Sequence, residues 1–331
     1  MTRILRNIGI AALSAFCSVL VLCPVAVFQA EAVAQTYPTK PIRMVVTNAP
    51  GSGADVISRL IGGKLSEALG QQIVIDNRPG ASGRIGMENG ARSAPDGYNL
   101  LMVTSSNVVA SAMFENLKYD IIKDFSPISL LGMTPFIVVV NPSLKATSIA
   151  ELVALAKSQP GKLKYGQGSE SQRLSAEIFK SIAGCDILNV PYKGSSAAVT
   201  GTMGGEVHMT FQAIPTVMSL IKSGKLRALG VTSAKRTSLV PDMPAISESL
   251  PGYEYNGWYS LVAPAKTPPP IISKLHAEVV KVLHIPVMRE RLKVLGVDAL
   301  GTTPQECRAY QQTQLEQMKG ALKRAGLRTG Q

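Results

Sequence analysis

The stretch IRMVVTNAPGSGADVISRLIGGKLSEALGQQIVI, residues 42–75, decides the fold of this chain. Its residues 42–47 have the pattern of a strand, and a loop of small and polar residues follows at 48–54. Apolar residues then fall at positions 56, 57, 60, 61, 65 and 69, which is the spacing of one helix face, and Gly70 is placed to end that helix. A strand pattern at 73–75 completes a strand, helix and strand unit, so we expect a parallel sheet.

The same order of elements recurs along the chain. A Gly-rich stretch that we expect to be irregular precedes a strand at 98–104, and a further strand at 136–140 ends at Asn141-Pro142. Ser148 and Glu151 then form a capping box for a helix. We therefore expect an α/β protein of two units, with boundaries near Pro142 and Gly257. The later elements that we expect are strands at 162–165, 187–190, 207–211, 226–232 and 257–262, and helices at 195–203, after Pro215, at 270–283, at 286–295 and from a Thr303 capping group to about 325.

The first residues have the pattern of a secretory signal peptide. Arg3 and Arg6 precede a largely apolar run at 8–28, and the small residues Ala32-Val33-Ala34 follow it. The run is long enough, at roughly 20 residues, to span a bilayer as an uncleaved anchor. Because Pro24 interrupts the run and the A-x-A site follows it, we expect cleavage after Ala34 and export to the periplasm.

The charge of the chain does not indicate a nucleic-acid partner. The formal net charge is +12, but Lys and Arg are dispersed along the sequence, with no run longer than Lys235-Arg236 or Lys323-Arg324 and no basic cluster interleaved with aromatic residues. This pattern predicts a solvated basic surface that attracts anions.

Cysteine usage predicts no disulfide framework. Cys17 and Cys23 leave with the signal peptide, so Cys185 and Cys307 alone reach an oxidising compartment. The two could pair, but we expect free thiols, because each stands alone in its own segment.

Three segments place small polar residues between a strand and a helix, at 48–55, 104–107 and 166–171. Free N–H groups at a helix N-terminus, together with the helix dipole, hold an anion without a cationic side chain. In a parallel α/β sheet such segments lie at the carboxyl ends of the strands, where ligands bind. The alternative is that these residues are ordinary caps and turns.

Sequence signatures of catalysis are missing. The first loop lacks the third glycine of a dinucleotide fingerprint, and the chain has no P-loop, no G-x-S-x-G, no H-E-x-x-H and no C-x-x-C. His208, His276 and His284 lie far in sequence from the Gly-rich segments. We therefore predict a protein without catalytic residues, cofactor or metal site.

At this point the sequence resembles a known family, the Bug-type periplasmic receptors of tripartite tricarboxylate transporters. The matching motifs follow one another across nearly all of the chain after the signal peptide. They are Tyr37-Pro38-Thr39-Lys40-Pro41-Ile42, Ala49-Pro50-Gly51-Ser52-Gly53-Ala54-Asp55, Asn77-Arg78-Pro79-Gly80-Ala81-Ser82-Gly83, Ala94-Pro95-Asp96-Gly97-Tyr98, Lys123-Asp124-Phe125, Val190-Pro191-Tyr192-Lys193-Gly194, Gly224-Lys225-Leu226-Arg227-Ala228-Leu229 and Leu250-Pro251-Gly252-Tyr253.

The resemblance implies a type II periplasmic-binding-protein fold, in which two lobes joined by a hinge enclose the ligand. It implies that lobe one comprises residues 37–137 and 257–331 and that lobe two comprises 138–256. It also implies that loops of both lobes hold a ligand carboxylate. The implied ligand-binding residues are Ala49, Gly51, Ser52, Gly53, Asp55, Thr104, Ser105, Ser106, Gly168, Ser169, Ser171, Arg173 and Gln212.

Several of these positions depart from the usual family pattern. Thr47-Asn48 stands where Pro-Phe is common, Ser52 where glycine is common, and Arg173 where histidine is common. Gln212 replaces a frequent aspartate, which removes an acceptor for a ligand ammonium and removes repulsion toward a second anionic group. We therefore favour a di- or tricarboxylate over an amino acid, with simple packing of Gln212 as the alternative.

The predicted function is a monomeric receptor that delivers a carboxylate to a membrane permease. A ligand sensor of the same fold for a signalling partner is the first alternative. A periplasmic hydrolase or isomerase is the second, and it would need a reactive pair of side chains that the sequence does not offer.

Overall fold

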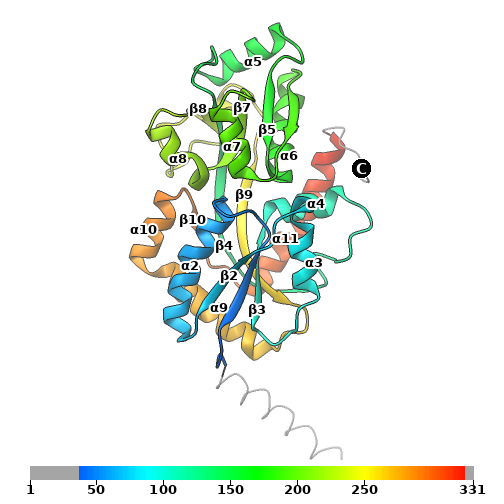
Figure 1. Ribbon diagram of the computed structural model, residues 1–331, viewed down its shortest axis with the longest axis vertical. Helices are drawn as coiled ribbons and strands as arrows, with labels where there is room; N and C mark the ends of the chain where they lie inside the picture. Colours follow the sequence, from blue (N-terminus) through cyan, green and yellow to red (C-terminus); the bar gives the residue numbers. More distant parts are fainter. Residues whose placement is uncertain (1–36, 325–331) are drawn as a thin grey trace, which may run out of the picture.

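Two β-sheets, each covered by helices, form the two lobes of the protein (Figure 1). The computed structural model describes residues 37–324, apart from the side chains of residues 321 and 324, so the expected signal peptide lies outside the described residues. Within residues 37–324, no helix combines the length and the apolar character needed to cross a membrane.

The sheet of lobe one begins with the strand, helix and strand unit of residues 42–75. Its first three strands along the chain run parallel to one another, and an antiparallel strand lies between the third of them and the long strand that continues into lobe two. The strands lie in the order β2 (Ile73–Asn77), β1 (Ile42–Val46), β3 (Asn99–Thr104), β9 (Asn256–Pro264) and β4 (Phe125–Val140), with β10 (Asp298–Ala299) paired to β4.

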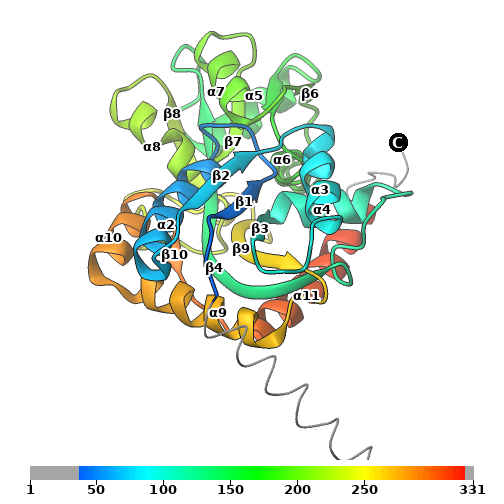
Figure 2. The ribbon, with the colours of Figure 1, turned by 60° about the horizontal axis from the view of Figure 1, so that its bottom comes forward.

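Helices cover both faces of this sheet (Figure 2). Side chains alternate between the faces of a strand, so Met44 packs into one apolar cluster with α2 and α9, and Val45 into another with α3 and α11. The helices of lobe one are α2 (Gly53–Leu69), the 3-10 turn η1 (Ala81–Gly83), α3 (Arg84–Ala91), α4 (Ser105–Met113), α9 (Pro269–His284), α10 (Pro286–Val294) and α11 (Pro304–Arg324).

The sheet of lobe two is built on the second half of β4. This strand of 16 residues pairs with β9 over 125–135 and with β7 over 136–140, so one strand belongs to both sheets. The other elements of lobe two are β5 (Lys164–Gln167), β6 (Leu188–Pro191), β7 (Met209–Ala213), β8 (Arg227–Val231), α5 (Ile149–Ser158), α6 (Glu170–Ala183), α7 (Ser195–Met203), α8 (Ile214–Lys222) and η2 (Ile246–Glu248).

The expected element order is confirmed, and several helix ends have the expected caps. Gly70 ends α2 in the left-handed conformation, with φ 66°. Thr303 and Glu306 form the reciprocal capping box of α11. At α5, Ser148 caps the helix as expected, but the Glu151 carboxylate accepts from the N–H of Thr147 in place of Ser148.

Two local expectations were wrong. The Gly-rich stretch expected to be irregular contains η1 and the helix α3, whose buried face is made by Gly86, Met87 and Gly90. Residues 104–107 do not form a loop, because β3 ends at Thr104 and α4 begins at Ser105.

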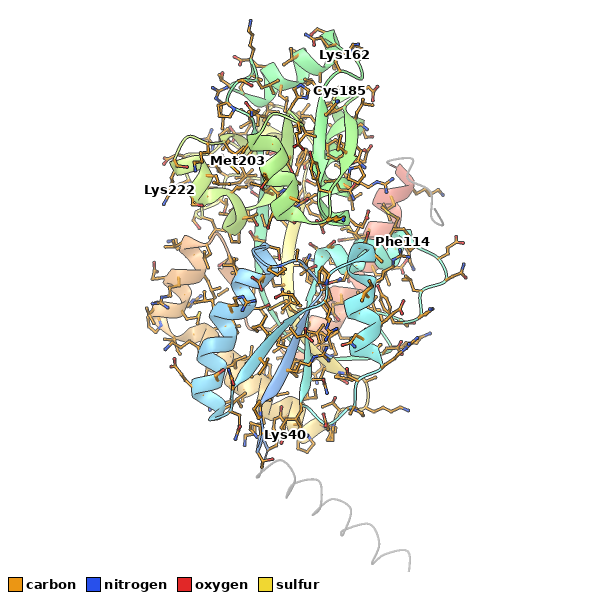
Figure 3. The ribbon with its side chains drawn as sticks, in the orientation of Figure 1. Lys40, Phe114, Lys162, Cys185, Met203 and Lys222 are labelled. Carbon is orange, nitrogen blue, oxygen red and sulfur yellow. The ribbon has the colours of Figure 1, made fainter. Side chains whose placement is uncertain are left out.

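Both cysteines within the described residues are free thiols, as expected. Cys185 follows α6 in lobe two (Figure 3), whereas Cys307 lies buried in α11 of lobe one. Burial raises the pKa of both thiols, which disfavours the reactive thiolate.

We predict that Phe179→Ala destabilises the protein by about 3–5 kcal/mol. Phe179 has 0% exposure and makes edge contacts with Phe211 and Tyr253, so truncation leaves a cavity in lobe two. Urea unfolding measures the loss. The control Val294→Ala, at a side chain with 69% exposure, should change the free energy of unfolding by less than about 0.5 kcal/mol, and equal effects would contradict the assigned core.

Candidate functional site

A small cavity lies between the two lobes, where strands of both sheets end. It has a volume of ≈ 50 Å³. By the measure in which one water needs about 10–15 Å³, this space suits a single carboxylate group. We call it the inner cavity; its lining residues are Asn48, Ser52, Gly53, Ala54, Thr104, Ser105, Ser106, Thr134, Phe136, Ser169, Ser171, Gln172, Ser195, Gln212, Ala213, Thr216, Gly257, Trp258 and Tyr259.

Neutral polar groups dominate this lining. Among the described residues around the inner cavity there is no charged side chain, and the polar side-chain groups are hydroxyls, amides and the indole N–H of Trp258. Tyr259 has the pKa of its phenol raised by burial, so this hydroxyl stays protonated and can donate. An anion in the cavity must therefore be stabilised by hydrogen bonds and helix dipoles.

The helices α4 and α7 both begin at the cavity, and neither has an acidic residue in its first turn. In α4, Asn107 Oδ1 accepts from the N–H of Thr104 at 2.9 Å, while the N–H groups of Ser105 and Ser106 have no acceptor within the helix. In α7 the cap is Gly194, which has no side chain to cap the helix, and Ser195 in the first turn lines the cavity. Both helix starts are suited to hold an anion.

The other two helix starts named by the sequence each carry their own carboxylate, Asp55 in α2 and Glu170 in α6. Asp55 Oδ2 accepts from the N–H of Gly51 at 3.0 Å, and Arg59 and Asn77 also donate to the carboxylate. Burial opposes the ionisation of Asp55, but these hydrogen bonds outweigh it and lower the pKa. Asp55 thus fixes the loop around the cavity.

Hydroxyl groups join the lobes across the cleft. Ser105 Oγ of lobe one lies 3.0 Å from Ser171 Oγ of lobe two. Ser82 Oγ of lobe one donates to Glu170 Oε1 of lobe two at 2.7 Å. These contacts mark the structure as a closed form.

Gln212 belongs to a hydrogen-bond network beneath the cavity. Gln172 Nε2 donates to Gln212 Oε1 at 2.9 Å, and Gln212 Nε2 donates to Thr210 Oγ1 at 2.9 Å. Gln172 Nε2 also donates to Ser195 Oγ at 2.8 Å. Gln212 therefore orients Gln172 and through it the hydroxyl of Ser195. A carboxylate at position 212 could not donate to Thr210 Oγ1, so the Thr210 hydroxyl would have to donate to the carboxylate instead.

A larger cavity adjoins the inner one toward the η1 side of the cleft. Its volume is ≈ 550 Å³, and it shares Asn48, Ser52, Ser106, Ser169 and Ser195 with the inner cavity. We call it the outer cavity; its remaining lining residues are Thr47, Ala49, Pro79, Gly80, Ala81, Ser82, Gly83, Gln167, Gly168, Glu170, Pro191, Tyr192, Lys193 and Gly194.

Most of the ligand-binding residues expected from the sequence lie around these cavities. Ser52, Gly53, Thr104, Ser105, Ser106, Ser169, Ser171 and Gln212 line the inner cavity, and Ala49 and Gly168 line the outer one. Three others line neither cavity. Gly51 and Asp55 shape the first loop, and Arg173 Nη1 lies 3.7 Å from Met113 Sδ.

Several residues that line the inner cavity were not among those expected from the sequence. Trp258 and Tyr259 belong to β9 and Thr134 and Phe136 to β4, and they meet the cavity through long-range strand pairing. Ser195 at the start of α7 had a detectable signal, because it follows a strand and opens a helix in the same way as Ser105. None of the described residues form a cluster of three or more His, Cys, Asp or Glu side chains that could hold a metal ion.

Known proteins share this sequence and fold. Residues 57–327 match the family described as tripartite tricarboxylate transporter family receptor. Protein BugT of Bordetella pertussis is 33% identical over 98% of each chain. The structure of R. palustris Rpa4515 with adipate has a TM-score of 0.86 at 33% identity, covering 88% of this chain and 99% of that one. MatC of Rhodopseudomonas palustris, with bound malate, has a TM-score of 0.82 at 27% identity, covering 86% and 100%.

These similarities agree with the resemblance drawn from the sequence motifs and with the two-lobed α/β architecture. The chain belongs to the receptor family of tripartite tricarboxylate transporters.

Proposed function

We propose that the cleft binds a small organic di- or tricarboxylate, one carboxylate of which occupies the inner cavity. The observation that carries this proposal is the neutral inner cavity at the starts of α4 and α7, which have no acidic residue in their first turns. Backbone N–H groups and hydroxyls there replace the water lost by the anion.

The size of the two cavities favours a ligand longer than a single carboxylate group. The inner cavity of ≈ 50 Å³ takes one end of the ligand, and the rest extends into the outer cavity of ≈ 550 Å³. Related proteins support this class, since Rpa4515 is described with adipate and MatC with malate.

We assign the contacts to the residues that the sequence indicated. Ser105 and Ser106 bind from lobe one beside Ser52 and Gly53, and lobe two closes over the ligand with Ser169 and Ser171. The walls of the cavities are completed by Thr104, Ala49, Gly168 and Gln212, and the first loop is held by Gly51 and Asp55. Arg173, whose Nη1 lies 3.9 Å from Glu170 Oε2, contributes a positive charge near the site.

The role that follows is delivery of the ligand, by a periplasmic monomer without catalytic activity, to the membrane permease of a tripartite transporter. Membership of the receptor family supports this role. A sensor that presents its closed form to a signalling partner would use the same cleft. A hydrolase or isomerase has less support, because the inner cavity has no titratable base among its described lining residues.

Loss of one cavity hydroxyl should weaken binding without unfolding the protein. We predict that Ser105→Ala and Ser106→Ala each lose about 1.5–3 kcal/mol, or roughly tenfold to a hundredfold in affinity. The ligand for this calorimetric test is the best binder in a thermal-shift screen of small carboxylates. Ser158→Ala, at a hydroxyl that bonds its own helix at Leu155, is the control; wild-type affinity in both cavity variants would refute the assignment.

A side chain at Gly53 should abolish binding. An added Cβ there would lie 2.7 Å from the Tyr259 hydroxyl and 3.4 Å from Ala213 of lobe two, so Gly53→Val should obstruct both ligand and closure. The same change at Gly63 of α2, where nothing lies within 4 Å of an added Cβ, should leave binding unchanged. Calorimetry compares the two, and tight binding by Gly53→Val would contradict the site.

The lobes should move as rigid bodies when ligand binds. We propose that lobe one comprises 37–137 and 257–331 and lobe two 138–256, with the hinge in the crossing segments 136–141 and 256–262. Solution scattering should give a smaller radius of gyration with ligand than without it. An unchanged radius at saturating ligand would count against hinge closure.

Export should leave Gln35 as the first residue. This expectation rests on Ala32-Val33-Ala34 after the apolar run. Mass spectrometry of the periplasmic fraction should detect the chain cleaved after Ala34, whereas a membrane-bound precursor of full mass would support the anchor alternative.

A further inference from the structure

A further large cavity lies beside the crossing strands and shares no lining residue with the inner or the outer cavity. Its volume is ≈ 650 Å³, within the range of about 300–1,000 Å³ that is usual for pockets that hold small molecules. We call it the hinge cavity. Helix α6 of lobe two, α11 of lobe one and the crossing segment form its walls, which include Ile178, Ile182, Tyr255, Tyr310 and Met318. Figure 1 shows α11 rising from lobe one toward α6.

The hinge cavity and the inner cavity lie on opposite faces of the crossing strands. Thr134 of β4 pairs with Gly257 of β9, and both residues line the inner cavity. Their neighbours Met133 and Asn256 line the hinge cavity instead. Successive residues of a strand face opposite sides, so the strands separate the two spaces. A rotation of the lobes about these strands that narrows the cleft therefore widens the hinge cavity.

Two aromatic contacts connect the walls of the two cavities. Phe136 lines the inner cavity, and its ring centroid lies 5.3 Å from that of Tyr255 in the hinge cavity. Trp258 also lines the inner cavity, and it makes an edge contact with Tyr310 at a centroid distance of 5.7 Å. A ligand that fixes Tyr255 and Tyr310 would therefore act on two side chains of the cleft.

The charge of the hinge cavity is opposite in sign to that of the chain, whose formal net charge is +12. Among the described residues that line the cavity, Glu254 has the one charged side chain. This exposed carboxylate accepts from Asn256 Nδ2 at 3.2 Å and takes part in none of the ion pairs between described residues. Burial raises the pKa of the Tyr310 phenol, and Tyr255 and Glu254 raise it further, so this phenol stays neutral. A carboxylate beside tyrosine rings and aliphatic side chains suits an apolar cation and disfavours an anion.

We propose that the hinge cavity binds a small organic cation, an ammonium group on an apolar body, and that the bound cation stabilises the closed form of the receptor. Glu254 attracts the ammonium group, and the rings of Tyr255 and Tyr310 contact it. Ile178 and Ile182 pack against the apolar body. Because opening of the cleft narrows the hinge cavity, a cation inside it opposes reopening. The coupling to the cleft rests on the proposed function, whereas binding of the cation does not.

Matched amines and alcohols test binding at the hinge cavity. Calorimetry on the mature protein, without a carboxylate ligand, compares 2-phenylethylamine with 2-phenylethanol and hexylamine with hexan-1-ol. In at least one pair the amine should bind about fivefold or more tightly than the alcohol, because only the amine carries a charge for Glu254 and the tyrosine rings. Binding of neither amine, or equal binding within both pairs, would overturn the inference.

Two variants locate the cation. Glu254→Gln keeps the size of the side chain and removes its charge, so the amine should lose most of its preference over the alcohol. Ile182→Lys, at a side chain that is 39% exposed, places a like charge in the cavity and should weaken the amine about tenfold or more. Unchanged amine binding in either variant would place the cation elsewhere and overturn the inference.

The controls make the same two changes at exposed positions away from the cavity. Glu67→Gln replaces a glutamate of α2 that pairs with Lys64, and Val74→Lys adds a lysine to β2 at a side chain that is 43% exposed. Both controls should bind the amine as the wild type does. A loss in Val74→Lys as large as in Ile182→Lys would show that added net charge, and not the hinge cavity, weakens binding, and would also overturn the inference.

The coupling is measured in the cleft. At an amine concentration that saturates the wild type, the best carboxylate from the screen should bind about fivefold or more tightly than without amine, and Ile182→Lys should show no such gain. By reciprocity, the carboxylate should tighten amine binding by the same factor. An unchanged or lower carboxylate affinity would overturn the stabilisation of the closed form. If no carboxylate binds, the proposed function itself fails, and the amine measurements still decide whether the hinge cavity holds a cation.

Discussion

The binding site depends on one physical constraint, the unsatisfied N–H groups at the start of α4. The first turn of a helix leaves donors without acceptors, and here the side chain of Asn107 satisfies the N–H of Thr104 while those of Ser105 and Ser106 are left for another partner. Asp55 and Glu170 supply internal carboxylates at α2 and α6, and no acidic residue does so at α4. In the closed cleft, the starts of α2 and α6 therefore have carboxylates of their own, and the start of α4 in lobe one is left for an external anion.

The strand β4 brings the second half of the site to this point. Because it pairs in both sheets, the carboxyl ends of the lobe-two strands face those of lobe one. Ser195 and the hydroxyl of Ser171 then lie opposite Ser105, and Gln172 and Gln212 hold Ser195 in place. Binding and closure use the same hydroxyls, so a ligand that fills the cavity also joins the lobes.

Much of the fold could be predicted from the sequence, because it is encoded locally. Within residues 42–75, the apolar residues have a strand spacing in some stretches and a helix spacing in another, and these stretches do not overlap. Gly70 and Thr303 mark helix ends by the capping chemistry of their own residue type. The helix α3 was missed because its core-facing positions are Gly86, Met87 and Gly90, and glycines give no apolar period.

The site was predictable to the extent that it consists of strand-to-helix junctions. Ser105, Ser106 and Ser171 follow that pattern and line the inner cavity. Trp258 and Thr134 could not be found in this way, since they reach the cavity through pairing between strands more than a hundred residues apart in the chain. Glu170 was not among the site residues expected from the sequence, because a glutamate in the first turn of a helix is an ordinary helix residue and its burial is seen only in the structure.

The most direct test of the central claim is a crystal structure with the best carboxylate from the screen. We expect a carboxylate in the inner cavity, within about 3 Å of the N–H groups or hydroxyls of Ser105 and Ser106. A carboxylate held instead by Lys193, with water in the inner cavity, would contradict this assignment.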